Sequence, residues 1–247
     1  MGSRVEGAGV ELAYRERGAG PPVLLVHGMA DSAEGCEPLM DALAVDARVI
    51  AYDRRGYGAS GAPDVYERTS VNEQAEDAAA VLRGAGAAPV VACGVDLGAL
   101  VVLDLLIRHP ARVRGAVLLA PPLFALVPTA NEPLAEERAR LEEAVRAHGP
   151  EAAVEAWLAT HAPEAPPRRV AAARAAHRAF FADLGGLSGW PVGRGELRSI
   201  SQPVVIYAGA RAAAHEAAAA AALAALLPAA RRPEHTDLLD AVRELLL

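Results

Sequence analysis

An aspartate at the centre of a Gly-x-x-x-Gly frame is the residue of this sequence best placed to do chemistry. The frame is Gly94-Val95-Asp96-Leu97-Gly98, between the apolar run APVVACG and a helical pattern that begins near Gly98. Small neighbours let the backbone bend sharply, so the central side chain projects above the sheet edge and the next N–H points into the same space. A carboxylate is ionised at neutral pH and attacks an sp3 carbon without a base. We therefore predict that Asp96 reacts, although Asp is also favoured as a helix N-cap.

The apolar runs and helical patterns around this frame predict an α/β fold. Up to about residue 127, short apolar runs alternate with helical segments, which is typical of strands joined by crossovers in a parallel sheet. Strands are expected at VELAYRER, PPVLLVHG, ARVIAYDRRG, APVVACG, GAVLLAPP, QPVVIYAG and near 229–234. Helices are expected at 33–44, 70–85 with a capping-type Ser70, 98–109, 212–227 and from 236 onwards.

A helical insertion interrupts this alternation. Residues 128–190 contain no credible strand, and the alternation resumes after Trp190 and Pro191. The sequence therefore predicts an α/β core made of 1–127 and 191–247, with a helical lid over 128–190. Within the insertion three helices are expected, at about 132–148, 150–161 and 166–183.

Composition and charge favour a small molecule as the partner. The formal net charge of -7 provides no basic field for nucleic acid. The two cysteines, Cys36 and Cys93, make neither a disulfide framework nor a metal-ligand set, and no histidine pair has the spacing of a metal motif. The start MGSRVEGAGV lacks a charged region followed by an apolar one, and the apolar runs are short or interrupted, so we expect neither a signal segment nor a membrane span. We expect a soluble cytoplasmic protein without metal or cofactor; its oligomeric state, including a homodimer, stays open.

Several motifs, taken in order, resemble the α/β-hydrolase superfamily over essentially the whole chain. They are LLVHGMADS (24–32), AYDRRGYGAS (51–60), GVDLG (94–98), the insertion in the position of a lid, and PEHTDLLDAVRELL (233–246) in the position of the terminal histidine. The resemblance implies a mostly parallel eight-stranded sheet with helices on both faces, and a nucleophile, acid and histidine in that chain order.

The same resemblance assigns roles to individual residues. It implies that Asp96 is the nucleophile, that His235 is the base, and that the backbone N–H groups of Met29 and Leu97 form an oxyanion hole. Family members with an aspartate at this turn are epoxide hydrolases and dehalogenases. They open a carbon–oxygen or carbon–halogen bond by carboxylate attack, and a histidine-activated water hydrolyses the resulting ester.

The sequence departs from the family pattern at the acid that orients the histidine. This acid usually follows the seventh strand, where the matching residue is Ala212, or the sixth strand, where LLAPPLFA has no carboxylate. Glu216, Glu234 and Asp237 are the candidate replacements for this acid.

The partners of the known reactions are missing as well. Epoxide hydrolases use lid tyrosines to protonate the oxygen of the epoxide ring, yet all five tyrosines of this chain lie outside 128–190. Dehalogenases carry a tryptophan or an arginine near the nucleophile, where this chain has Leu97 and Leu100. Three hypotheses follow. The first is a divergent hydrolase in which lid histidines or water act as the acid. The second is a cyclase, lyase or isomerase of secondary metabolism that uses Asp96 and His235 as acid and base, and the third is a catalytically dead small-molecule binding protein.

The few aromatic residues of the insertion predict an apolar substrate pocket. We place Trp157, Phe180, Phe181 and Trp190 in its wall together with His27, whose expected part is to support the oxyanion loop rather than to react. Arg54 and its neighbour Asp53 are expected to be structural.

Overall fold

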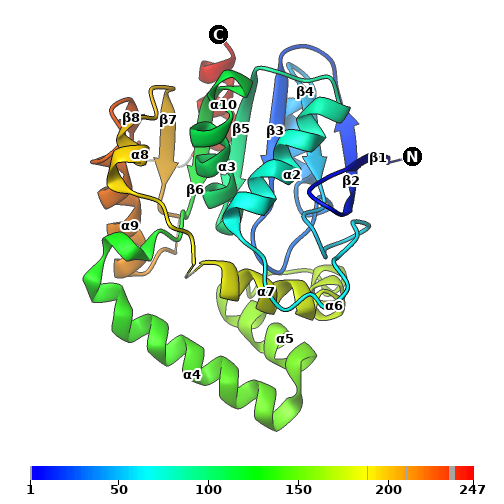
Figure 1. Cartoon of the computed structure of the whole chain (residues 1–247), viewed down its shortest axis with the longest axis vertical. Coiled ribbons are helices and arrows are strands. Elements are labelled where there is room, and N and C mark those ends of the chain that lie inside the picture. Colours follow the sequence, from blue (N-terminus) through cyan, green and yellow to red (C-terminus); the bar gives the residue numbers. More distant parts are fainter. Residues whose placement is uncertain (1, 188, 210, 234–236) are drawn as a thin grey trace.

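The sheet at the centre of the protein has eight strands, most of them parallel. The computed structural model describes residues 2–187, 189–209, 211–233 and 237–247. The strand order is β1-β2-β4-β3-β5-β6-β7-β8, with β2 antiparallel to both of its neighbours and the remaining pairs parallel (Figure 1). The strands are β1 (Ser3–Glu6), β2 (Glu11–Arg17), β3 (Pro22–Val26), β4 (Arg48–Tyr52), β5 (Val90–Val95), β6 (Val113–Leu119), β7 (Val204–Tyr207) and β8 (Ala230–Arg231). The predicted fold class is confirmed.

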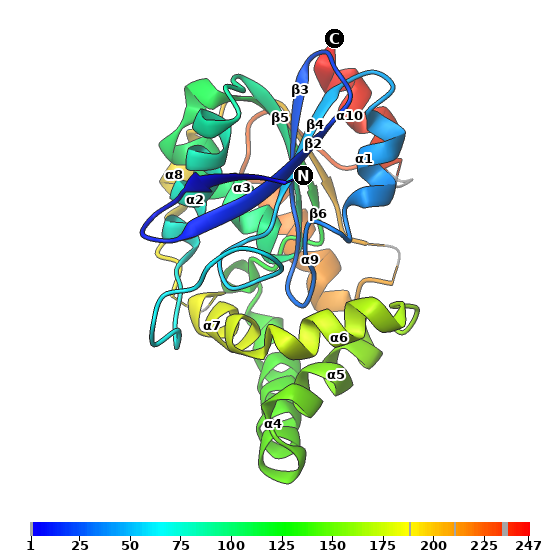
Figure 2. The same cartoon turned by 90° about the vertical axis from the view of Figure 1, so that its right-hand side faces the viewer.

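Helices cover both faces of this sheet because the buried strands are apolar on both sides. Along β3, Leu24 and Val26 belong to one core layer and Val23 and Leu25 to the other. The first layer is closed by α2 (Val71–Gly84), α3 (Leu97–Arg108) and α9 (Ala214–Ala224), and the second by α1 (Glu37–Leu43) and α10 (Leu238–Leu246) (Figure 2). The short α8 (Arg194–Arg198) contacts α3.

The predicted start of α2 is confirmed in detail. Ser70 Oγ accepts a hydrogen bond from the Glu73 backbone N–H at 3.2 Å, and Glu73 Oε2 accepts one from the Ser70 N–H at 2.9 Å. This reciprocal pair satisfies two backbone donors that the first turn of a helix leaves without partners.

The insertion forms a layer of helices beneath the sheet (Figure 1). Its helices are α4 (Asn131–His148), α5 (Pro150–His161), α6 (Pro167–Ala175) and α7 (His177–Leu187). The expectation of one helix over 166–183 was wrong, because the chain breaks at Ala176 with φ -91° and ψ 20°. The break lets α6 pack along α5 while α7 buries Phe180 and Asp183.

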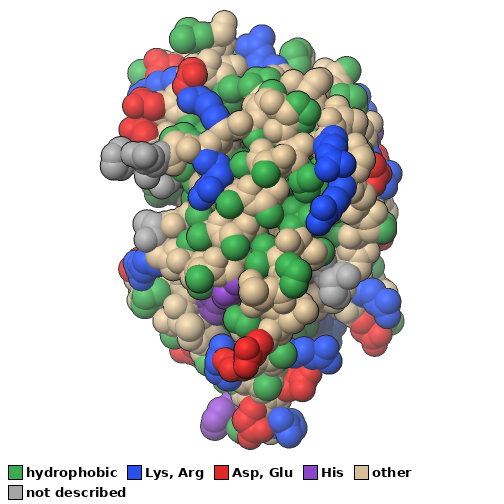
Figure 3. Space-filling view, turned by 90° about the vertical axis from the view of Figure 1, so that its left-hand side faces the viewer, with side chains coloured by type: hydrophobic (Ala, Val, Ile, Leu, Met, Phe, Trp, Pro, Cys, Tyr) green, Lys and Arg blue, Asp and Glu red, His purple; other side chains and the backbone are tan. Residues whose placement is uncertain are grey.

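Helix α4 is largely exposed. Leu141 is its single buried residue, and ion pairs such as Arg138–Glu142 at 2.7 Å lie along its surface. Figure 3 shows acidic and basic side chains next to one another at the end of the molecule where α4 lies. Across the described residues, no helix has the length and apolar character needed to cross a membrane.

Replacing Gly98 with alanine is expected to destabilise the protein by about 1–3 kcal/mol through overpacking. A Cβ at this position would lie 2.3 Å from the Val26 carbonyl oxygen, so β3 or α3 must shift. Gly195→Ala is the matched control, because a Cβ there meets no heavy atom within 4 Å. Urea unfolding measures both variants, and equal transition midpoints for Gly98→Ala and the parent would contradict the prediction.

Candidate active site

The strand-to-helix turn after β5 presents Asp96 to the interior of the protein. Its backbone angles, φ 51° and ψ -124°, are unusual for a residue with a side chain, and such a conformation costs about 1–3 kcal/mol. Although Asp96 directly precedes α3, its side chain makes no capping hydrogen bond to that helix. Its Oδ2 instead accepts a hydrogen bond from the Met29 backbone N–H at 2.9 Å. The side chain is therefore held by the loop after β3, and capping does not explain it.

The two backbone amides expected to form an oxyanion hole, those of Met29 and Leu97, both contribute hydrogen bonds to the Asp96 carboxyl group. Burial raises the pKa of Asp96 above its usual value, and hydrogen bonds from the backbone N–H groups of Met29 and Leu97 oppose that rise. Gly28 allows the close approach of the loop, because a Cβ there would lie 3.0 Å from Asp96 Cβ. The arrangement places two N–H donors around a carboxylate, where they can also bind charge that develops on it.

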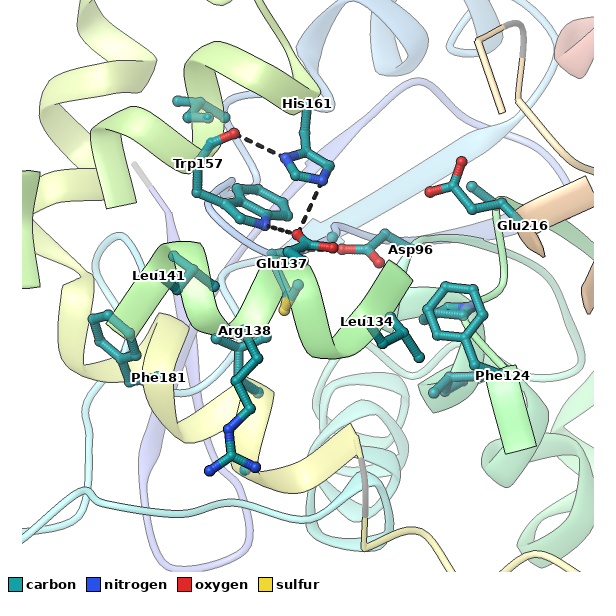
Figure 4. Close-up of a pocket in the computed structure, with 18 of the residues that line it drawn as sticks. Asp96, Phe124, Leu134, Glu137, Arg138, Leu141, Trp157, His161, Phe181 and Glu216 are labelled. Atoms are coloured by element: carbon teal, nitrogen blue, oxygen red, sulfur yellow. Dashed lines mark hydrogen bonds and ion pairs between the residues drawn. The ribbon is translucent and has the colours of Figure 1, made fainter. Parts of the chain in front are cut away.

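Asp96 lines a cavity of about 1240 Å³ between the core and the insertion (Figure 4). Three of the aromatic residues predicted for the pocket, Trp157, Phe181 and Trp190, line the same cavity. Trp190 is also anchored, since its Nε1 donates to Asp104 Oδ1 at 3.1 Å. Further apolar residues of the wall are Leu100, Leu123, Phe124, Leu134, Leu141, Leu158 and Leu184. The cavity is large and mostly apolar around one carboxylate.

Two residues predicted for the pocket wall do not line this cavity. Phe180 is fully buried behind it, with its ring centroid 5.0 Å from that of Trp157. His27 is buried behind the oxyanion loop, where Nδ1 lies 2.8 Å from the Gly28 oxygen and Nε2 accepts from the Arg54 N–H at 3.0 Å. Burial lowers the pKa of His27, which favours the neutral ring that these two contacts require. The placement of both residues in the pocket wall was wrong.

Arg54 joins the oxyanion loop to the insertion. Its guanidinium donates to the carbonyl oxygens of His27 and Gly28, each at 2.9 Å, and forms a fully buried ion pair with Asp183 of α7 at 2.8 Å. Asp183 also accepts from the Tyr57 hydroxyl at 2.7 Å and from Gln74 Nε2 at 2.9 Å. The buried charges are thus satisfied on all sides, which is the condition for retaining them. Arg54 is structural, as expected.

The candidate replacements for the missing acid lie after β7 and β8, and the segment after β6 offers none. Ala212 stands between β7 and α9, and the residues from Ala120 to Ala125 that line the cavity include no carboxylate. Glu216 Oε2 accepts from the Ala213 N–H at 2.7 Å, and Asp237 Oδ1 accepts from the Asp240 N–H at 3.0 Å. Both carboxylates therefore cap helices. The predicted base His235 and the third candidate, Glu234, lie outside the described residues.

The insertion contributes a polar cluster that the sequence did not single out. Glu137 of α4 and Trp157 and His161 of α5 are hydrogen-bonded to one another, and all three line the cavity with Asp96. The i, i+4 spacing of Trp157 and His161 places them on one helix face, but nothing in the sequence pairs that face with Glu137. Among the described residues, no group of three or more His, Cys, Asp or Glu side chains could hold a metal ion.

Comparison with known proteins agrees with this fold. The family model for the α/β hydrolase fold matches residues 21–162, which is more than half of the chain. The chain is 34% identical over 119 residues to an uncharacterized hydrolase, YraK, of Bacillus subtilis, covering 48% of this chain and 44% of that protein. It is 34% identical over 124 residues to bifunctional epoxide hydrolase 2 of Sus scrofa, covering 50% of this chain and 22% of that protein. The matches thus span less than half of the length of these relatives.

A solved structure matches over nearly the full length. It is an α/β hydrolase from Sphaerobacter thermophilus, with a TM-score of 0.71 and 27% identity, and the match covers 99% of this chain and 98% of that one. The strand order, the turn that carries Asp96 and these similarities lead to one assignment. The chain belongs to the α/β-hydrolase fold family.

Proposed function

We propose that the protein is a hydrolase that opens a polar bond at an sp3 carbon of a hydrophobic small molecule through a covalent ester on Asp96. The observation that carries this proposal is the Asp96 carboxylate itself, which lines an apolar cavity with Oδ2 held by the Met29 N–H. Oδ1 is then the oxygen available for attack on the substrate carbon. The insertion over 128–190 serves as the lid that excludes water from this cavity.

The same geometry supports the second half of the reaction. When water attacks Cγ of the ester, negative charge develops on Oδ2, which is the atom that the Met29 N–H already contacts. The Leu97 N–H adds a second donor to that carboxyl group. Collapse of the intermediate breaks the bond between Cγ and Oδ1, so Oδ1 leaves with the substrate carbon as an alcohol, and the oxygen from water remains in the Asp96 carboxylate. In this proposal His235 takes the proton of the attacking water.

Trapping the ester tests this function. In His235→Gln, incubation with styrene oxide is expected to add one substrate mass to the protein, and peptide mapping should place it on Asp96. The reason is that attack needs only the carboxylate, whereas release needs the base. The control is His235→Gln combined with Asp96→Asn, which should acquire no adduct. An adduct that maps to another residue, or no adduct at all, would contradict the proposal.

A second candidate function is proton transfer without an ester, as in a cyclase, lyase or isomerase. The raised pKa of Asp96 favours it, because burial brings the carboxyl group closer to the range of an acid or base catalyst. Water labelled with ¹⁸O separates the two. In a single turnover, the ester route places ¹⁸O in the Asp96 carboxylate, since the product takes its new oxygen from Oδ1. Proton transfer alone leaves both product and Asp96 unlabelled.

A further inference from the structure

Two side chains of α5, those of Trp157 and His161, converge on one carboxylate oxygen of Glu137 at the wall of the cavity (Figure 4). Glu137 Oε1 accepts from Trp157 Nε1 at 2.6 Å and lies 3.1 Å from His161 Nε2. The His161 and Trp157 rings are stacked, with centroids 4.1 Å apart and an angle of 14° between their planes. The stacking on Trp157 and the contact with Glu137 fix the orientation of the His161 ring.

The partners of His161 indicate which protons it carries. Nδ1 lies 2.9 Å from the Trp157 carbonyl oxygen, and Nε2 faces the Glu137 carboxylate. Both partners accept hydrogen bonds and neither donates, so the ring satisfies both when it is the doubly protonated imidazolium. Burial lowers the pKa of His161, but the hydrogen bonds to Glu137 and to the Trp157 carbonyl oxygen, together with the charges of Glu137 and Glu216, more than offset this, and the pKa is raised overall. The hydrogen bond from His161 in turn holds the pKa of Glu137 below its usual value.

Position within the cavity distinguishes His161 from the other histidines of the insertion. His161, Glu137 and Asp96 all line the one cavity, with His161 on the lid side and Asp96 on the core side. His148 lies at the exposed end of α4 in a separate surface depression. His177 begins α7, with Nδ1 3.1 Å from the Arg174 oxygen, and does not line the cavity.

We propose that His161, oriented by Glu137, is the acid that protonates the oxygen leaving the substrate when Asp96 attacks. In this step a bond forms between Asp96 Oδ1 and the substrate carbon, and the carbon–oxygen bond breaks. Its electron pair stays on the oxygen and takes the Nε2 proton of His161, which passes from its hydrogen bond with Glu137 Oε1 to the substrate oxygen. The products are a hydroxyalkyl ester of Asp96 and a neutral imidazole, which regains a proton from water after the ester is hydrolysed.

The proposal names a substrate class and rests on the proposed function. An oxygen leaving group, as in an epoxide, requires a proton because an alkoxide is strongly basic, whereas bromide leaves without one. The site is therefore adapted to a strained cyclic ether rather than to an alkyl halide. Glu137 is a positioning residue, and it keeps the Trp157 Nε1 donor when the His161 proton has left.

Two probes with the same phenylethyl frame test the assignment, styrene oxide and 2-bromoethylbenzene. In the His235→Gln background, the rate of Asp96 alkylation is followed by intact mass. Adding His161→Gln is expected to slow alkylation by the epoxide by about 10²–10³-fold, the range of a lost general acid, and to leave alkylation by the bromide within about threefold. His177→Gln is the matched control and should change neither rate, because that ring lies outside the cavity.

Other outcomes separate this inference from the function on which it rests. If His161→Gln slows both probes equally, or slows neither, His161 is not the acid, while alkylation of Asp96 still supports the hydrolase. If neither probe alkylates Asp96 in the His235→Gln background, both the inference and the proposed function are overturned.

The pH profile provides a readout that a merely structural role would not change. Alkylation by the epoxide should fall as pH rises through the raised pKa of His161, since the protonated ring is the reactive form. Glu137→Gln removes one of the two acidic groups that raise this pKa, Glu216 being the other, so the fall should move to lower pH. Alkylation by the bromide should show no such fall. An epoxide profile that is unchanged in Glu137→Gln would overturn the positioning role.

Discussion

Asp96→Asn is expected to lower turnover by about 10⁴-fold or more, because loss of a covalent nucleophile removes the step on which the reaction depends. The amide nitrogen and oxygen of asparagine fit the space of the carboxylate but do not attack carbon. The measurement is steady-state turnover of an accepted epoxide, with ester formation followed by intact mass. Turnover within tenfold of the parent would show that Asp96 is not the nucleophile.

The same substitution is expected to stabilise the fold at neutral pH. Burial raises the pKa of Asp96, so the folded state disfavours the charged form relative to the unfolded chain. For a carboxyl group shifted upward, this cost appears as pH rises above the unfolded pKa and is absent in more acidic solution. The advantage of Asp96→Asn should therefore be present at pH 7 and shrink as pH falls towards about 4. Asp41→Asn, at a largely exposed carboxylate, is the control and should change stability by less than about 1 kcal/mol.

Arg54→Ala is expected to destabilise the protein by about 3–5 kcal/mol, because it leaves the Asp183 charge buried without its cation. The substitution also removes the donors that hold the carbonyl groups of His27 and Gly28. Since Met29 follows directly, the amide that contacts Asp96 should lose its fixed position and turnover should fall as well. Denaturant unfolding monitored by tryptophan fluorescence measures the stability change.

Two further variants test whether burial is the cause. Arg211→Ala breaks an exposed pair with Glu164, 2.9 Å apart, and is expected to cost less than about 1 kcal/mol. Arg54→Met combined with Asp183→Leu removes both buried charges and should be less destabilising than Arg54→Ala alone. A double variant at least as unstable as the single one would show that the uncompensated charge is not the main cause.

The elements of the core could be predicted from the sequence because their signals are local. Apolar runs mark β3, β4 and β5, and Ser70 with Glu73 marks the start of α2. The strand β1 and the helix α8 were missed, since each is short and carries little apolar pattern. The break at Ala176 was missed because alanine favours a continuous helix, and it is the burial of Phe180 and Asp183 that decides the direction of α7.

The sequence by itself determined the α/β fold, the turn that carries Asp96 and the helical insertion. These follow from glycine spacing, apolar periodicity and chain order, which act over a few residues. Only the tertiary structure decided which side chains share the cavity. It placed Trp157 and His161 of α5 around one carboxylate oxygen of Glu137 on α4, and paired Arg54 with Asp183, 129 residues away. Contacts of that kind arise from packing between elements, and no local sequence pattern identifies the residues that make them.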